Sequence, residues 1–591
     1  MNTAENPGLS QLADQVLRIV DPKTEAIPWR ALLEHMTAYP AGKMVPPLKP
    51  PKTASRPRRI VAVRFELRGD PMEGTPQPVS VSWCDGGPVG RVMLDGAAEP
   101  HQLVAEALFT HKNRGALLAL PDGAAQTFAV FLRRYARALV REGYSMEPLT
   151  AGATIRGLIV RKQKHSWVLC DVGVMTGLEQ LPEAEFIACF DADGSPGLPP
   201  SRRLFQALSS WQSYSLEHFG SQAGPTVGRS ALSAASRHLG ASEWLWRAHP
   251  LAVAMLRPGG GYRGGYAAAG RYSGPAWRAD MNKAYTWALG EPMPSRLGFV
   301  HRADPTKPAP GIYMCNVWGH GAAPIYLGCY QPVERTFERT LWHGGSTWAV
   351  LTSTEIQGIR ELGYSVVPGA GLSYLSTFTL RGFVDQVTRV TAEFGRGSPQ
   401  ERIARAYGVS VYGKLAERPE RDQVMYAAER PGDEWFPFVN NAGDEIADLW
   451  RASTVAHRPH QHVDAASEIT ARVRSRLYSA IAIVRAAGGE VPHADTDGFL
   501  SSIDPTQLLG EQGTAPGLWR VEESAQEAMV WGAKGYAFGS DVRAAGLHGI
   551  TPDMARRLLQ GETMQAEMRK RSAPFGDAPL FEPLRRQVRA S

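Results

Sequence analysis

The chain has 591 residues, 43% hydrophobic and 21% charged, a composition that excludes a disordered, collagen-like or coiled-coil protein. Its 64 Lys and Arg against 58 Asp and Glu give a net charge of +6, which permits a polyanionic partner without requiring one. The 5 Cys form no CxxC pair, so neither a disulfide framework nor a structural zinc site is expected, and a reducing cytoplasm is the expected compartment. No apolar run approaches the length of a membrane span, so no membrane partner is expected.

The order of apolar and turn-forming residues predicts an α/β domain in the first half of the chain. Residues 1–40 have helical patterning, and the Pro-, Lys- and Arg-rich stretch over 46–59 is typical of an extended basic linker. The next elements are expected to be strands over 60–67, 79–83, 154–161 and 166–171, and helices over 102–109, 124–141 and 202–219. This alternation indicates an α/β domain over about 59–222.

In the second half of the chain, the pattern of apolar and turn-forming residues is less regular. A Gly- and Pro-rich region covers 290–375, and long amphipathic helices are expected over 398–413 and 465–487. A last basic helical stretch is expected over 552–572. No repeat of fixed period is present.

Three aspartates stand out by their sequence context. Asp280 is expected at the end of a short strand, and the segment around Asp495 and Asp497 is typical of a tight β-hairpin tip. Because residues i and i+2 of a strand point to the same side, Asp495 and Asp497 are expected to face one way. Carboxylates so grouped suit Mg²⁺, a hard ion that also binds substrate phosphates. For an isolated Asp-x-Asp pair, a solvated turn is the alternative.

A helix is expected to begin at Ser398, because Ser398 and Glu401 form a capping box around Pro399. Gly408 and Gly413 are expected to leave one face of this helix bare, so that a flat group can approach closely. The cationic and aromatic residues of this face predict a platform for a triphosphate and a base. They are Arg402, Arg405 and Tyr412, with Arg396 just before the cap. A solvated cationic helix with a core tyrosine is the alternative.

These segments follow one another in a set order, which is Asp280-Met-Asn-Lys-Ala-Tyr285, Arg405 with Tyr412-Gly-Lys414, Asp495-Thr-Asp497, and Lys534-Gly-Tyr536. The order resembles motifs A, B, C and KxY of family B DNA polymerases. Upstream, Tyr262-Arg263-Gly264-Gly265 resembles the YxGG template-binding loop of that family. The YRGG form, the short spacings and the total length are similar to the protein-primed branch, the phi-29-like phage and plasmid replicases. The resemblance covers roughly 258–550.

The resemblance implies an α/β multidomain fold with an α+β palm, in which an RNase H-like exonuclease-type domain precedes a right-hand palm, fingers and thumb. The implied divisions are 1–58 (helical extension and basic linker), 59–222 (exonuclease-like), 223–290 (palm), 291–378 (first insertion, terminal-protein-region-1-like), 379–415 (fingers), 416–446 (second insertion, terminal-protein-region-2-like), 447–550 (palm) and 551–591 (thumb). In the family the two insertions support strand displacement and dock a terminal protein. The role of 1–58 is open, with a partner-binding helical pair and a passive appendage as the alternatives.

The resemblance also implies roles for single residues. Asp280 and Asp497 would hold two Mg²⁺ ions, with Mn²⁺ as the alternative metal, and Asp495 would be an auxiliary catalytic carboxylate. Tyr285 would stack under the sugar of the incoming dNTP and exclude a 2′-hydroxyl. The other implied nucleotide-binding residues are Arg396, Arg402, Arg405 and Tyr412. The implied contacts to primer-template DNA are Tyr262, Arg263, Gly264, Gly265, Lys414, Lys534 and Tyr536.

Some positions depart from the family pattern. Arg405 stands where Lys is usual, Val409 where Asn is usual, and His493 and Gly498 stand where Tyr and Ser are common. The change from Lys to Arg keeps the charge but replaces a point charge by a planar fork. The metal carboxylates are intact, so these changes are expected to alter fidelity, nucleotide preference or speed.

The exonuclease-like domain departs further. Its first strand has Arg64 and Glu66 where an Asp-x-Glu pair is required, and Gln126 stands where a second metal-binding Asp belongs. No acidic residue occurs in the third segment, around 200–210, while Asp171 keeps its usual place. An arginine at this site would repel Mg²⁺, so a retained fold without 3′–5′ proofreading is expected.

The leading hypothesis is a template-directed DNA polymerase without proofreading that copies a phage or mobile element. Two alternatives stay open. One is a polymerase that begins without a primer or extends ends without a template, in a defence or repair setting. The other is a catalytically silent nucleic-acid-binding scaffold. The sequence does not decide between a terminal protein, an oligonucleotide and de novo initiation.

Overall fold

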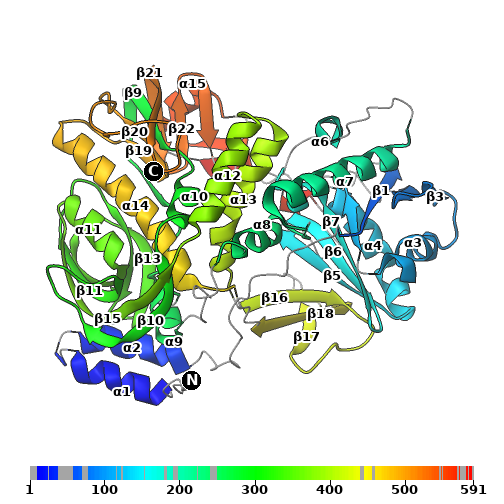
Figure 1. The fold of residues 1–591 in the computed structure, drawn as a ribbon, viewed down its shortest axis with the longest axis horizontal. Helices are drawn as coiled ribbons and strands as arrows, with labels where there is room; N and C mark the ends of the chain where they lie inside the picture. The colour runs from blue at the N-terminus through cyan, green and yellow to red at the C-terminus, as the bar shows by residue number, and fades with distance from the viewer. Residues whose placement is uncertain are drawn as a thin grey trace.

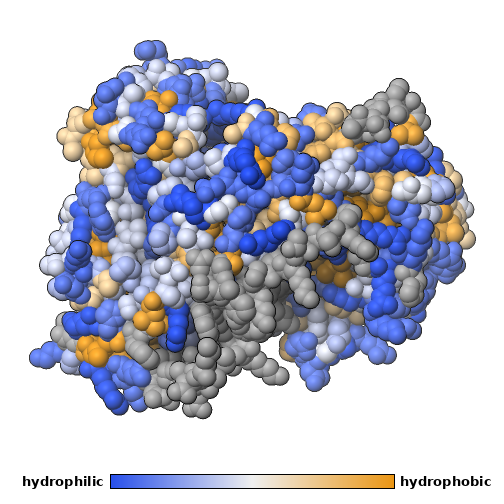
Figure 2. Space-filling view, in the orientation of Figure 1, coloured by the Kyte–Doolittle hydropathy of each residue, from blue (hydrophilic) through white to orange (hydrophobic). Residues whose placement is uncertain are grey.

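The computed structural model describes residues 9–20, 22–23, 25–37, 58–68, 77–114, 116–121, 124–151, 154–178, 183–190, 198–222, 224–239, 249–257, 259–418, 420–439, 445–455, 460–544, 547–548, 550–568, 571–572, 581–582 and 585–588. Most of the basic linker over 46–59 lies outside these residues. No helix among the described residues is long and apolar enough to cross a membrane. Hydrophilic residues cover most of the face shown in Figure 2, with smaller apolar areas between them.

The exonuclease-like region is built on a mixed sheet. Its strands are β1 (Ile60–Arg68), β2 (Gln77–Cys84), β3 (Gly90–Met93), β4 (Leu117–Leu120), β5 (Tyr144–Ala151), β6 (Thr154–Lys162) and β7 (His165–Asp171), in the order β5-β6-β7-β4-β1-β2-β3. β1, β4 and β7 are parallel, and the other pairings are antiparallel. Successive residues of β1 enter different cores, because Ile60 and Ala62 pack on one side and Val61 and Val63 on the other. A strand buried on both faces requires such an unbroken apolar run.

Helices cover both faces of this sheet (Figure 1). They include α3 (Pro100–Leu108), α4 (Ala124–Arg141), α5 (Val172–Thr176), α6 (Glu183–Phe190) and α7 (Pro200–Phe219). The strands and helices predicted for 60–219 are therefore confirmed, and their ends differ from the expected ones by at most two residues.

A three-stranded meander extends the same sheet. It comprises β16 (Glu420–Tyr426), β17 (Trp435–Val439) and β18 (Glu445–Val455), and β16 joins β5 where Tyr426 pairs with Met146. The second insertion was expected to end at 446, but β18 continues to Val455 and its last residues pair with the first residues of β16. This insertion therefore lies edge to edge with the exonuclease-like sheet, although about 270 residues separate β5 from β16 in the chain.

The palm is a seven-stranded antiparallel sheet in the order β23-β22-β21-β9-β20-β19-β8. Its strands are β8 (Tyr266–Ala269), β9 (Tyr272–Met281), β19 (His493–Thr496), β20 (Gly498–Ser501), β21 (Trp519–Gly532), β22 (Gly535–Phe538) and β23 (Asp541–Ala544). On one face, Ala279 and Phe499 share a core with Leu477 of α14 (Val463–Ala486). The next residue along β20, Leu500, packs in a separate cluster. The palm sheet is thus assembled from strands more than 200 residues apart.

The region from 293 to 378 forms a sheet of its own beside the palm (Figure 1). Its strands are β10 (Met293–Arg302), β11 (Gly311–Gly319), β12 (Ile325–Gln331), β13 (Thr336–Trp342), β14 (Gly345–Thr352) and β15 (Ser365–Phe378), in the order β10-β15-β11-β14-β12-β13. The helix α11 (Ser353–Glu361) packs against α14, where Gly358 leaves no room for a Cβ because Ser475 Oγ would lie 2.5 Å from it. The first predicted insertion is therefore a β-module that is anchored on the palm helix.

Two N-terminal helices, α1 (Leu9–Ile19) and α2 (Ala26–Thr37), pack on this β-module and on α9 (Pro250–Leu256). Trp29 is fully buried there. Glu25 is also buried; its carboxylate accepts a hydrogen bond from the Ala370 amide at 2.6 Å and lies 3.3 Å from an Arg302 nitrogen. These contacts make the helical pair part of the chain's own core.

The fingers helices α12 (Arg381–Glu393) and α13 (Pro399–Leu415) lie between the palm and the exonuclease-like region (Figure 1). The predicted start of α13 is confirmed, since Ser398 Oγ accepts a hydrogen bond from the Glu401 amide at 3.1 Å. The Glu401 carboxylate accepts in return from the Gly397 amide, 3.2 Å away.

The expectation of one helix over 552–572 is wrong. The helix α15 (Pro552–Leu559) ends before Gly561, which has a φ of 93°, and the strand β25 (Met564–Met568) follows. A left-handed glycine ends a helix at little cost, because it lacks a Cβ. Arg569 and Lys570, which were expected on this helix, lie outside the described residues.

Candidate active site

Asp280 and Asp497 lie on neighbouring strands of the palm. Asp280 is near the end of β9, opposite Gly498 of β20, and the Met281 amide donates a hydrogen bond to the carbonyl oxygen of Asp497 at 2.9 Å. Two aspartates 217 positions apart in the chain therefore lie next to each other, at the same end of adjacent central strands.

Burial and negative neighbours raise the pKa of both carboxyl groups. Burial raises the pKa of Asp280 to about 6, with a further contribution from Glu522. Burial also raises the pKa of Asp497 to about 7, and Asp280 and Asp495 add to this effect. A bound divalent cation would relieve both the desolvation and the repulsion, so the pair has the electrostatic character of a metal site.

The turn between β19 and β20 separates Asp495 from Asp497. Thr496 has a φ of 66°, and the Asp497 amide donates a hydrogen bond to the Asp495 carbonyl oxygen at 2.8 Å. The alternation of a strand does not continue through such a tight turn. The expectation that the two carboxylates face one way because they are i and i+2 of a strand is therefore wrong in its premise.

Asp495 has a cationic partner instead. Lys534 Nζ lies 2.9 Å from Oδ1 and 3.0 Å from Oδ2 of Asp495, and Thr496 Oγ1 donates to Oδ1 at 2.9 Å. Lys534 belongs to the turn between β21 and β22, which Tyr536 follows. The structure thus brings motif C and the Lys-x-Tyr segment together, but through an ion pair that the sequence did not suggest.

Gly498 has a steric reason to be glycine. A Cβ at this position would lie 3.1 Å from Asp280 Oδ1 and 3.0 Å from the Ala279 carbonyl oxygen. A side chain here would press on the Asp280 carboxylate, so the departure from the usual Ser leaves that carboxylate more room.

A metal in this palm would depend on Asp280 and Asp497. Among the described residues, no three or more His, Cys, Asp and Glu side chains are grouped as a metal site. Two carboxylates leave several coordination positions for water and for substrate phosphates, which is the usual way in which Mg²⁺ is bound. The residues present therefore fit Mg²⁺ bound together with a phosphate-bearing substrate.

Two tyrosines from different elements stack beside these carboxylates. Tyr285 of α10 (Ala284–Leu289) and Tyr412 of α13 have ring centroids 4.4 Å apart at an interplanar angle of 12°. Burial raises the pKa of both phenols, with Asp497 among the negative groups that contribute. Tyr262 lies close enough to Tyr412 for the two phenols to interact electrostatically. Tyrosines of three motifs that are far apart in the sequence thus lie near one another.

The platform on α13 differs from its expected form. Gly413 is exposed with open space above it, but Gly408 is buried against α10, where a Cβ would lie 2.5 Å from Thr286 Oγ1. Gly408 therefore allows the two helices to approach closely, and the expectation that it leaves a bare face for a ligand is wrong.

The arginines of the fingers do not all lie at the carboxylates. Arg405 is close enough to Asp280 to oppose the rise in its pKa, and Arg405 Nε lies 3.6 Å from the Glu401 carboxylate. Arg402 instead acts on Cys189 of α6, in the exonuclease-like region. Arg396 is exposed in the connection between α12 and α13. Arg405 is thus near enough to Asp280 to affect its pKa, whereas Arg402 is near enough to Cys189 of the exonuclease-like region to affect the pKa of that thiol.

The Tyr262–Gly265 loop packs on the motif C hairpin. A Cβ on Gly265 would lie 2.7 Å from Thr496 Oγ1, whereas Gly264 has open space around it. The Arg263 side chain is fully buried, so the expectation that it contacts DNA is wrong. Its guanidinium donates instead to the carbonyl oxygens of Gly260 and Val350, at 2.9 and 3.1 Å.

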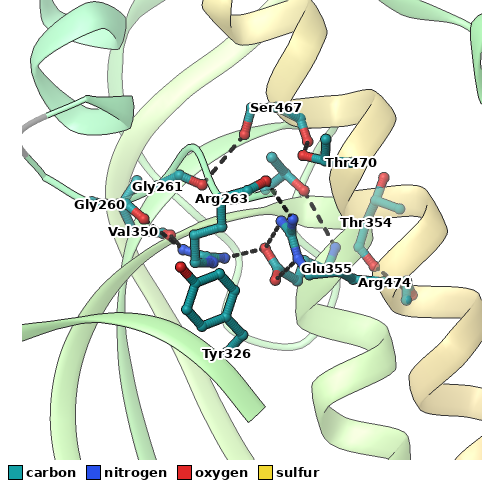
Figure 3. Close-up of polar contacts among 12 residues, drawn as sticks. Gly260, Gly261, Arg263, Tyr326, Val350, Thr354, Glu355, Ser467, Thr470 and Arg474 are labelled. Carbon is teal, nitrogen blue, oxygen red and sulfur yellow. Dashed lines mark hydrogen bonds and ion pairs between the residues drawn. The ribbon is translucent and has the colours of Figure 1, made fainter. Parts of the chain in front are cut away.

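Arg263 belongs to a buried ion triad with Glu355 of α11 and Arg474 of α14 (Figure 3). Arg474 Nε donates to Glu355 at 2.9 Å, and one Arg474 nitrogen donates to the carbonyl oxygens of Arg263 and Gly264, each at 2.7 Å. Burial alone would raise the pKa of Glu355, but the two guanidinium groups outweigh it and hold that pKa below its usual range. The triad fixes the loop to both the palm helix and the β-module.

The sequence contained no signal for this triad. Glu355 is 92 residues from Arg263 and 119 from Arg474, and each has the sequence context of an ordinary charged residue of a surface helix or loop.

Lys414, which was expected to contact DNA, lies near the end of α13. Its Nζ is 3.5 Å from a Glu417 carboxylate oxygen, and its aliphatic stem covers Gly228 of α8 (Val227–Ser236).

Among the described residues of the exonuclease-like region, no cluster of carboxylates lies at the expected place. Glu66 on β1 accepts a hydrogen bond from Ser80 Oγ at 2.8 Å and lies 3.7 Å from an Arg91 nitrogen. Asp171, at the end of β7, is buried, and its Oδ1 accepts from the Ala125 amide at the start of α4 at 2.7 Å. The side chain of Gln126 lies outside what the structure describes.

No family model matches this sequence, and no curated protein matches it significantly. Solved structures do share its fold. The phi29 DNA polymerase ternary complex with primer-template DNA and incoming nucleotide has a TM-score of 0.64 at 13% identity, over 91% of this chain and 100% of that chain. The phi29 post-translocation binary complex has a TM-score of 0.59 at 14% identity, over 90% and 100%. The chain therefore has the phi29 DNA polymerase fold along most of its length.

Proposed function

We propose that this chain is a DNA-directed DNA polymerase that transfers nucleotides from dNTPs to a 3′-hydroxyl. The observation that carries the proposal is the adjacency of Asp280 and Asp497, with raised pKa values of about 6 and 7, near the Tyr285–Tyr412 stack in a phi29-type fold. A silent nucleic-acid-binding scaffold would gain nothing from two half-buried carboxylates that repel each other. The structures of the phi29 enzyme with primer-template DNA and with nucleotide support DNA and dNTPs as the ligands.

The residues of the palm would divide the chemistry between them. Asp280 and Asp497 would hold two Mg²⁺ ions. Metal bound there would supply Lewis-acid activation of the primer hydroxyl and neutralisation of the charge on the pyrophosphate. Phosphoryl transfer asks little else of a protein than positioning and charge neutralisation. Arg405 would hold the triphosphate from the fingers side, and Tyr285 would support the sugar. Tyr412 would then line the new base pair.

The DNA-facing residues would position the two strands. Lys534 and Tyr536 would hold the primer terminus, with Lys534 exchanging Asp495 for a backbone phosphate. Tyr262, Gly264 and Gly265 would support the template. Arg263 would act only as a positioning residue, since it is buried in the triad.

We also propose that the exonuclease-like domain does not proofread. Arg64 and Glu66 occupy the strand where metal-binding acids are required, and Asp171 is engaged at the start of α4. A guanidinium at a two-metal site opposes cation binding. The domain is retained as a scaffold, because its sheet continues into the β16–β18 meander.

Priming by a protein is the finer part of the proposal. In the branch that the sequence resembles, two insertions dock a terminal protein, and the β-module over 293–378 and the β16–β18 meander occupy the positions of those insertions. A terminal protein would then supply the first hydroxyl during replication of a phage or mobile element.

Primer extension tests the proposal. Purified protein with a primed template, dNTPs and Mg²⁺ is expected to extend the primer, and Asp280→Asn and Asp497→Asn are expected to be inactive while keeping their fold. Two further reactions omit the primer or the template. Products formed without primer would argue against initiation from an oligonucleotide, and products formed without template would argue against template dependence. Equal activity of the wild type and both variants would overturn the proposal.

A further inference from the structure

Lys283 lies where the palm meets the fingers, three residues after Asp280. Its backbone is left-handed, with a φ of 48°. The turn is fixed by the neighbouring Asn282, whose amide donates to the Leu518 carbonyl oxygen at 2.9 Å. From this turn the side chain reaches the fingers, where Nζ donates to Thr391 Oγ1 of α12 at 2.5 Å. A palm residue thus crosses the seam beside the candidate metal site.

Two charged residues of α13 share the surroundings of Lys283. Burial lowers the pKa of Lys283; Glu401 opposes this effect and Arg405 adds to it. Glu401 is buried and also pairs with Arg405 at 3.6 Å. The Glu401 carboxylate therefore lies near two cations, Lys283 and Arg405. Together the three residues keep one net positive charge on the fingers side of Asp280.

This charge balance bears on how a triphosphate could be held. Arg405 alone, with Glu401 beside it, would offer almost no net charge to phosphate oxygens. Lys283 restores that charge from the palm side. Its ammonium is a compact charge on a flexible stem, and its present partner is a neutral hydroxyl. A charged phosphate oxygen is a stronger acceptor than a neutral hydroxyl.

We propose that Lys283 is a further triphosphate-binding residue, which exchanges Thr391 for a phosphate oxygen when a nucleotide enters between palm and fingers. This inference rests on the proposed polymerase function. It adds a cation that the motif pattern did not single out, and it gives the Lys283–Thr391 hydrogen bond the role of a resting position.

Steady-state kinetics on a primed template test the inference. Lys283→Met is expected to raise the KM for dNTP about tenfold or more, with kcat changed less than about threefold, because a charge-assisted hydrogen bond to the substrate is lost. Inhibition by added pyrophosphate is expected to weaken by a similar factor. Lys283→Arg, which keeps the charge, is expected to recover most of the affinity.

Thr391→Val is the matched control, since it removes the resting partner of Lys283 without removing the cation. Its KM for dNTP is expected to stay within about twofold of the wild type. The inference is overturned if Lys283→Met leaves both the KM for dNTP and the pyrophosphate inhibition unchanged. It is also overturned if Thr391→Val reproduces the Lys283→Met effect, because the Lys283–Thr391 hydrogen bond would then only hold the palm and the fingers together. Thermal unfolding of each variant shows whether it is folded. An inactive wild type would instead count against the proposed function.

Discussion

The rings of Tyr285 and Tyr412 stack 4.4 Å apart, centroid to centroid, and join the palm helix α10 to the fingers helix α13. Such a pair contributes about 0.5–1.5 kcal/mol beyond the area it buries. The stack lies beside Asp497, whose charge contributes to the raised pKa of both phenols. A nucleotide held by metals at Asp280 and Asp497 would therefore meet an aromatic surface made by both halves of the site.

Replacing Tyr285 by Ala is expected to increase the use of rNTPs relative to dNTPs about 10- to 100-fold, because the space for a 2′-hydroxyl opens. Tyr285→Phe keeps the ring and is the control, with discrimination near the wild-type value. The measurement is the ratio of kcat/KM for dCTP and CTP on one template. Unchanged discrimination in Tyr285→Ala would remove this residue from sugar selection.

The raised pKa values of Asp280 and Asp497 predict an unusual dependence of stability on pH without metal. Both carboxyl groups bind protons more tightly in the folded chain than in the unfolded chain, where an Asp pKa is near 3.9. Their contribution to the free energy of unfolding is therefore greatest below about pH 4 and decreases as the pH rises to about 7.

Asp497→Asn checks that dependence. In EDTA at pH 8 the variant is expected to be more stable than the wild type by on the order of 1–3 kcal/mol, since the buried charge is gone. At pH 4.5 the difference is expected to shrink, and Mg²⁺ at pH 8 is expected to stabilise the wild type more than the variant. Urea unfolding measures each value. The raised pKa of Asp497 would be contradicted if Asp497→Asn, compared with the wild type, had a lower free energy of unfolding at pH 8 than at pH 4.5.

The Lys534–Asp495 pair predicts opposite effects of its two members on DNA binding. Lys534→Met is expected to weaken binding of primer-template and to reduce the slope of log K against log salt by about one. Asp495→Asn releases the lysine and is expected to strengthen binding by up to about fivefold, since an exposed pair is worth at most about 1 kcal/mol.

Lys112→Met is the control for this pair, because Lys112 is an exposed lysine that pairs with Asp85 in the exonuclease-like region, 3.0 Å away. Fluorescence anisotropy at several salt concentrations measures all three variants. If Lys534→Met and Lys112→Met gave the same salt slope, Lys534 would have no specific place on the DNA.

The buried triad predicts a large loss of stability when Glu355 becomes Gln, by about 3–5 kcal/mol, because two guanidinium groups stay buried without their carboxylate. Glu361→Gln on the same helix is the control. Glu361 is exposed and accepts a hydrogen bond from Ser479, so its loss is expected to cost less than about 1 kcal/mol. Equal effects in urea unfolding would show that the triad contributes no more than a surface contact.

The exonuclease-like domain is expected to leave a 3′-mismatched primer intact in Mg²⁺ without dNTPs. Glu66→Ala is expected to change nothing in this assay, because Glu66 accepts a hydrogen bond from Ser80 and pairs with Arg91, and the described residues hold no group of three metal-ligating side chains. Shortening of the primer by the wild type, together with its loss in Glu66→Ala, would show that the domain proofreads.

Much of the site followed from local patterns in the sequence. The strand at Asp280, the hairpin at Asp495 and the cap at Ser398 are set by short-range rules, and the structure has all three. The partners of these residues are set by tertiary contacts. Nothing near Asp495 indicates Lys534, and the left-handed Thr496 turn, which separates the two carboxylates, is not a typical place for a β-branched residue.

The predictions for Arg263 and Gly408 are wrong because the same residue type can serve two physical purposes. An arginine in a template loop suggests a phosphate contact, but Arg263 is the buried cation of an ion triad. A glycine on a ligand-facing helix suggests an open surface, but Gly408 admits a neighbouring helix. Burial distinguishes these roles, and burial depends on elements about 100 residues away.

The most direct test of the central claim is single-nucleotide incorporation on four primed templates that differ only in the templating base. The wild type with Mg²⁺ is expected to add the complementary dNTP on each template, while Asp497→Asn adds none and still binds the DNA. Addition that ignores the templating base, or equal incorporation by Asp497→Asn, would contradict the account.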